Sequence, residues 1–163
     1  MRTPASIGSH PIHPMLIPFP FALWFFSLVA DIIYYATDRA IWEDVAFYTL
    51  AGGIVGAVIA AVPGFIDYLS IRDERVNSIA NWHARLNVIA LLVFAASFYL
   101  RTTDGMRMIN RNMMIPLLLS VLGVILIMIS GWLGGSMVYK HGIAVEPQPE
   151  ARTTEETRPR RVA

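Results

Sequence analysis

Hydrophobic and polar positions divide this chain into four long apolar segments separated by short polar stretches. The apolar segments cover about residues 14–36, 45–69, 81–100 and 114–138, and the second and fourth lack charge over most of their length. A helix that spans a bilayer needs roughly 20 mostly apolar residues. The pattern therefore predicts four membrane-spanning helices.

The two ends of the chain differ from this apolar middle. Residues 1–13 are polar and turn-forming, and Pro18 and Pro20 then interrupt the first apolar segment, so its start should be bent or partly unwound. Residues 147–163 lack apolar periodicity and predict a disordered C-terminal tail. The expected fold is all-α: one integral membrane four-helix bundle over residues 1–146, with a short polar N-terminal strap.

Composition supports a membrane protein and excludes several classes of function. Hydrophobic residues make up 55% of the chain and charged residues 15%, whereas soluble domains carry about 25% charged residues. A net charge of +1 argues against nucleic acid as a partner. The lack of cysteine excludes disulfides and thiolate ligands. No serine or threonine has a neighbouring base and oxyanion site, which argues against a hydrolytic enzyme. Whether the chain is an enzyme stays open, with a protein that is not an enzyme on its own favoured.

Basic residues predict how the helices are oriented. With four spans, the N-terminus, the loop at 70–82 and the tail share one side, and nine basic residues lie on or near it against four on the other. The nine are Arg2, Arg72, Arg75, Arg85, Lys140, Arg152, Arg158, Arg160 and Arg161, and the four are Arg39, Arg101, Arg107 and Arg111. The positive-inside rule then predicts a multi-pass protein of the inner (plasma) membrane with both termini in the cytoplasm.

Small residues recur at helical spacing in two of the apolar segments. Gly52, Gly56, Ala60 and Gly64 are each four residues apart, and the fourth segment ends in Ser130, Gly131, Gly134 and Gly135. Such faces let helix backbones approach closely. Tight packing within the bundle is the favoured interpretation; a homodimer face or a groove for a flat cofactor are the alternatives.

The chain has four histidines, and each lies near the end of an apolar segment: His10, His13, His83 and His141. Successive spans run in opposite directions, so these four segment ends lie on the same side of the bilayer. Histidine is the commonest side-chain metal ligand. The string His10-Pro11-Ile12-His13-Pro14 presents its two imidazoles from a stiff strap, because each residue before a proline is held extended. The alternative, without a functional site, is that each histidine is an ordinary polar residue at the membrane interface.

Two kinds of site are open to these histidines. Haem b would take His13 and His83 as axial ligands, with His141 as the substitute. A non-haem divalent metal such as zinc, copper or iron would take His10, His13, His83 and Asp67. The residues expected to support either site by packing or hydrogen bonding are Asn87, Gly64, Gly134 and Gly135.

Two acidic residues lie within the apolar segments, where ionisable groups are costly. Asp67 is on the histidine side and could accept a histidine N–H, bind a metal or relay protons. Alternatively it caps its helix or pairs with Arg72 or Arg75. For Asp31, which lies toward the opposite end, a structural role of this kind is favoured.

Four ordered motifs resemble the bacterial membrane family catalogued as domain of unknown function 2231, over about residues 8–146. They are His10-Pro11-Ile12-His13-Pro14 with Phe19-Pro20 and Asp31; Val62-Pro63-Gly64-Phe65-Ile66-Asp67-Tyr68; His83 with Asn87; and Ser130-Gly131-Trp132-Leu133-Gly134-Gly135 followed by Val138-Tyr139-Lys140-His141-Gly142 and Val145. The resemblance implies a four-helix integral membrane domain. Some members adjoin Rieske-type redox proteins, and the architecture is similar to small haem b cytochromes, which favours redox chemistry by analogy.

Three functions follow from these observations. The first is a membrane protein that binds haem b or a metal ion through the histidine cluster, for electron transfer with a separate redox protein. The second is a cofactor-free accessory subunit whose small-residue faces dock a partner. The third is a proton-coupled transporter that relays protons through Asp67 and the histidines.

Overall fold

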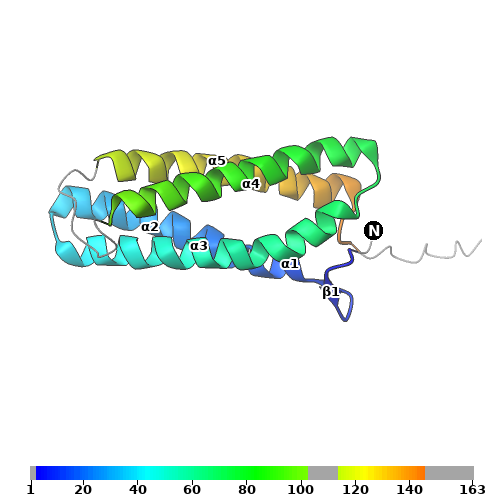
Figure 1. The fold of residues 1–163 in the computed structure, drawn as a ribbon, viewed down its shortest axis with the longest axis horizontal. Helices are drawn as coiled ribbons and strands as arrows, with labels where there is room; N and C mark the ends of the chain where they lie inside the picture. Colours follow the sequence, from blue (N-terminus) through cyan, green and yellow to red (C-terminus); the bar gives the residue numbers. More distant parts are fainter. Residues whose placement is uncertain (1–2, 103–113, 146–163) are drawn as a thin grey trace, which may run out of the picture.

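A computed structural model describes residues 3–102 and 114–145 of the chain (Figure 1). Its elements in chain order are β1 (Ser6–Ile7), β2 (His10–Pro11), α1 (Ile12–Leu16), α2 (Pro18–Thr37), α3 (Ala40–Leu69), α4 (Glu74–Leu100) and α5 (Met114–His141). The spans Ile12–Thr37, α3, α4 and α5 are each long and apolar enough to cross a membrane. The predicted all-α four-helix bundle is confirmed, and the tail at 147–163 lies outside the described residues.

The N-terminal strap contains a small element that the sequence pattern did not predict. β1 and β2 pair antiparallel around Gly8 and Ser9, whose φ angles are +54° and +68°. Two consecutive positive φ angles make the tight turn that suits a two-residue hairpin. Ile17 then separates α1 from α2, where the first interior proline, Pro18, begins the longer helix.

Two helices begin earlier than the apolar pattern predicts. α3 begins at Ala40 instead of residue 45, and α4 begins at Glu74 instead of residue 81. The prediction was late because it followed apolar residues, whereas polar first turns are stabilised by caps and acidic side chains. In α4 the Asp73 carboxylate accepts a hydrogen bond from the Arg75 N–H at 2.9 Å.

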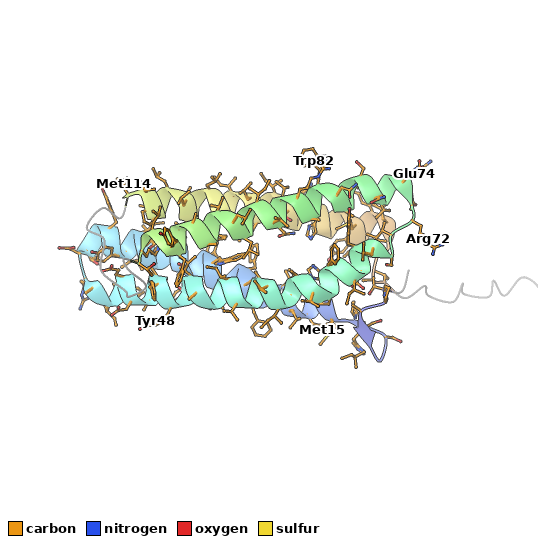
Figure 2. The ribbon with its side chains drawn as sticks, viewed as in Figure 1. Met15, Tyr48, Arg72, Glu74, Trp82 and Met114 are labelled. Carbon is orange, nitrogen blue, oxygen red and sulfur yellow. The ribbon has the colours of Figure 1, made fainter. Side chains whose placement is uncertain are left out.

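The four helices form two antiparallel hairpins, α2 with α3 and α4 with α5, and the closest packing is within each hairpin. In Figure 1 the strap, α1, the start of α4 and the end of α5 lie at the same end of the bundle. Outside, the helices expose apolar side chains, and Tyr48 and Trp82 point away from the bundle (Figure 2). Apolar surface this extensive suits contact with lipid.

Aromatic stacking joins the two hairpins in the middle of the bundle. The rings of Trp24 and Phe94 stack with centroids 4.2 Å apart, and Leu50, Ala90, Val124 and Ile127 complete this buried core. The core is narrow because most apolar side chains face outward. Contacts between the hairpins therefore depend on few residues.

An ion pair joins the hairpins at the end away from the strap. Arg101 donates to both carboxylate oxygens of Asp31 at 2.6 and 2.7 Å, and its second nitrogen also donates to the Ser120 hydroxyl at 3.2 Å. Arg101 is 4% exposed, so counting it among the basic loop residues was wrong. The basic residues opposite the termini are then Arg39, Arg107 and Arg111, the last two outside the described residues.

Candidate functional site

A cavity of about 240 Å³ lies between the two hairpins. Most of its lining is apolar or glycine, from α1 through α5. The side chains in the lining that carry polar atoms are those of His13, Trp24, Tyr68, His83, Asn87 and Ser130. An apolar cavity with a few convergent polar groups is the usual form of a ligand site in a helical bundle.

His13 enters the cavity from α1 and is held by the backbone of α3. Its Nδ1 lies 2.8 Å from the carbonyl oxygen of Ala60. A carbonyl oxygen only accepts hydrogen bonds, so Nδ1 carries the proton and Nε2 keeps its lone pair. Gly64 makes room for the ring, because an added Cβ there would lie 2.6 Å from His13 Nδ1. Pro63 precedes this glycine inside α3, and the end of α3 bends toward α4 in Figure 1.

His83 enters from α4 and is held by α5 in the same way. Its Nδ1 lies 2.9 Å from the Ser130 carbonyl oxygen and 3.0 Å from the Ser130 hydroxyl. At Gly134 an added Cβ would lie 3.2 Å from His83 Cε1. The Asn87 amide nitrogen donates to the His83 carbonyl at 2.9 Å and to Nε2 at 3.0 Å. Both imidazoles are thus protonated on Nδ1.

The two imidazoles lie next to each other across the cavity. Their ring centroids are 6.4 Å apart and their planes are at 88°. Two imidazoles bound through Nε2 on opposite sides of one metal ion, with metal–nitrogen bonds of about 2 Å, have centroids roughly 6 Å apart. The separation of His13 and His83 matches that requirement.

The other predicted ligands lie apart from this pair. His10 is exposed in β2, with Nδ1 donating to the Gly8 carbonyl at 2.8 Å. His141 is exposed at the end of α5 and does not line the cavity. Asp67 accepts the Ala5 N–H at 2.8 Å, which ties the strap to α3. Within residues 3–102 and 114–145, no three His, Cys, Asp or Glu side chains lie close enough to hold a metal ion.

Some of the residues predicted to support the site contact the histidine pair, and one does not. Asn87, Gly64 and Gly134 contact the histidine pair, whereas an added Cβ at Gly135 would meet nothing within 4 Å. The carbonyls of Ala60 and Ser130 could not be singled out from the sequence, because a backbone group carries no signal of its own. Tyr68 was also missed; its hydroxyl donates to the Asn81 side-chain oxygen at the edge of the cavity.

Comparison with known proteins gives a family and no function. The family model described as "Predicted membrane protein (DUF2231)" matches residues 9–147, and the chain belongs to this family. No curated protein and no solved structure matches the chain.

Proposed function

We propose that this member of the DUF2231 family binds one haem b between its two hairpins and uses it for electron transfer. His13 and His83 would be the axial ligands. The observation that carries the proposal is the pair of perpendicular imidazoles, 6.4 Å apart, in a mostly apolar cavity. Each ring has its Nδ1–H bonded to a backbone carbonyl, and this leaves Nε2 as the nitrogen that can bind iron.

The set of donors favours a metal macrocycle over a bare ion. Zinc and similar ions take three or four protein ligands. Among the described residues two imidazoles line the cavity, and the other polar side chains there are the neutral Trp24, Tyr68, Asn87 and Ser130. A porphyrin brings its own four equatorial nitrogens and needs only axial ligands from the protein. Two histidines on facing helices supply that need.

The shape of the cavity sets where the macrocycle would extend. At about 240 Å³ the cavity is smaller than common ligand pockets of about 300–1,000 Å³. Two of its lining residues, Phe65 of α3 and Val88 of α4, are 61% and 58% exposed. The cavity therefore reaches the apolar outer surface between α3 and α4, and the macrocycle edge would lie there, against lipid.

The surroundings of the histidines suit a redox centre. Haem, when bound, supplies one-electron chemistry whose potential depends on the axial ligands and on burial. The carbonyls of Ala60 and Ser130 accept the Nδ1–H of each ring and so fix its orientation, with Nε2 as the nitrogen available to iron. The chain has no cysteine for an iron–sulfur centre, so we propose a separate redox protein as electron partner. A second proposed partner is another copy of the chain, which would pack against the small-residue face of α5.

Titration with haemin tests this proposal. Wild-type protein in detergent should bind one haemin per chain with a low-spin, six-coordinate spectrum, and His13→Ala or His83→Ala should lose it. The matched controls His10→Ala and His141→Ala alter histidines outside the cavity and should titrate as wild type.

Other outcomes of the titration support other functions. A folded wild-type protein that binds no haemin contradicts the proposal and favours the accessory-subunit function. Stoichiometric metal without a Soret band, lost in His10→Ala and Asp67→Ala, would instead support the non-haem site at His10, His13, His83 and Asp67.

A further inference from the structure

The two helical hairpins repeat the same contacts at a constant spacing of 70 residues. His13 bonds the Ala60 carbonyl and His83 the Ser130 carbonyl; Ser27 bonds the Ala46 carbonyl and Ser97 the Pro116 carbonyl. The same shift applies to close approaches of glycine to a ring: Gly53 lies against Trp24, and Gly123 lies against Phe94. Contacts of three kinds at one spacing indicate that the hairpins are two versions of one structural unit.

Equivalent residues of the two units also meet each other. Trp24 stacks on Phe94, 70 positions later, and Asp31 pairs with Arg101 at the same spacing. His13 and His83 are the third such pair. Residues that contact their own equivalents lie near a two-fold axis. The hairpins are therefore related by an approximate two-fold axis, and this axis runs through the cavity. Each hairpin therefore supplies one half of the ligand site.

The two half-sites differ at several positions, among them Ser130, which takes the place of Ala60, and one of these differences lies at Nε2 of the histidine. Ile17 follows His13 by one helical turn, with its N–H bonded to the His13 carbonyl at 3.1 Å. Asn87 follows His83 by the same interval, and both residues line the cavity. Isoleucine donates no hydrogen bond from its side chain, whereas the Asn87 amide donates to His83 Nε2 at 3.0 Å. The symmetry of the site is broken at the nitrogen that would bind iron.

We propose that Asn87 makes His83 the displaceable axial ligand and leaves His13 as the permanent one. This rests on the proposed haem site. Nε2 has one lone pair, so it bonds either to iron or to the Asn87 N–H. When His83 is not bound to iron, Asn87 would hold its ring. Asn87 is thus a positioning residue that would leave one face of a bound haem open to a small neutral ligand such as carbon monoxide.

Exchanging the two residues tests this inference in the full-length protein. Asn87→Ile gives His83 the neighbour that His13 has, and Ile17→Asn does the reverse. Losing one competing hydrogen bond should tighten haemin binding in Asn87→Ile by about 3- to 10-fold. Carbon monoxide should bind the reduced variant more slowly by a similar factor. Ile17→Asn should weaken haemin binding, and the double exchange should return it to near the wild-type value.

The outcomes separate this inference from the haem site itself. Asn87→Ile with wild-type haemin affinity and wild-type carbon monoxide kinetics would overturn the role of Asn87 while leaving the haem site intact. The role of Asn87 is equally overturned if the variant only lowers the unfolding temperature of haem-free protein, because that is what a purely structural residue would do. If wild-type protein binds no haemin, the proposed function itself fails.

Discussion

Residue contacts to backbone atoms define the candidate site. His13 and His83 are each held by a carbonyl four residues before a glycine, Ala60 before Gly64 and Ser130 before Gly134. The missing Cβ lets the ring lie against the helix. The sequence singled out both histidines and both glycines, but their pairing across 47 positions became visible only in the fold.

Gly64→Ala tests whether this contact positions His13. The added Cβ would lie 2.6 Å from Nδ1, so the ring must shift and haemin binding should weaken by at least tenfold. Gly135→Ala is the matched control, since its Cβ meets nothing within 4 Å. Equal haemin affinity in both variants, measured by Soret titration, would show that the His13 position does not depend on Gly64.

Asp67 has a structural contact that makes a separate prediction. Its carboxylate accepts the Ala5 N–H, and asparagine can still accept there whereas leucine lacks an acceptor. Hydrogen exchange at the strap should therefore rise roughly tenfold or more in Asp67→Leu and change little in Asp67→Asn. If Asp67→Asn instead abolishes a proton-coupled flux while the strap stays protected, Asp67 serves in transport.

At the level of elements, each hairpin is well packed and the two hairpins meet through few contacts. The Trp24–Phe94 stack, the Phe47–Phe98 stack and the Asp31–Arg101 ion pair join the hairpins away from the cavity. Apolar runs predicted the four helices because a spanning segment must be both long and apolar. They did not predict Asp73 as a cap or Arg101 as a buried partner, because those roles depend on residues that lie outside the apolar runs or 70 positions away.

Breaking the ion pair should be more harmful than removing it. Arg101→Met leaves Asp31 buried without its cation, and should lower the free energy of unfolding by about 3–5 kcal/mol. The double variant Asp31→Leu with Arg101→Met removes both charges and should recover most of that loss. Unfolding of detergent-solubilised protein measures both, and a double variant as unstable as the single one would refute a simple pairing role.

At the level of the whole molecule, the alternating direction of the four helices predicted which residues share an end of the bundle. It did not predict which of those residues touch. The strap, α1, the start of α4 and the end of α5 do lie at one end of the bundle (Figure 1). Yet only His13 and His83 face the cavity, because strap geometry and helix rotation decide the rest. The 70-residue repeat was also missed, since few of its matching positions carry the same residue in both hairpins.

Orientation is a prediction for the whole molecule. With Arg101 buried, the basic residues still favour the side of the termini, so a green fluorescent protein fused after Ala163 should fold in the cytoplasm and fluoresce. Alkaline phosphatase at the same position should be inactive. The opposite pair of results would place the strap and the histidine pair on the outer face of the membrane.

The proposed haem b between His13 and His83 is open to one direct measurement. It is a reduced-minus-oxidised optical spectrum of the wild-type protein purified from membranes of cells supplied with haem, with haem counted per chain. We expect a b-type spectrum at one haem per chain that is lost in His13→Ala and His83→Ala and kept in His141→Ala. A folded, colourless wild-type protein that stays colourless after haemin is added would contradict the proposal.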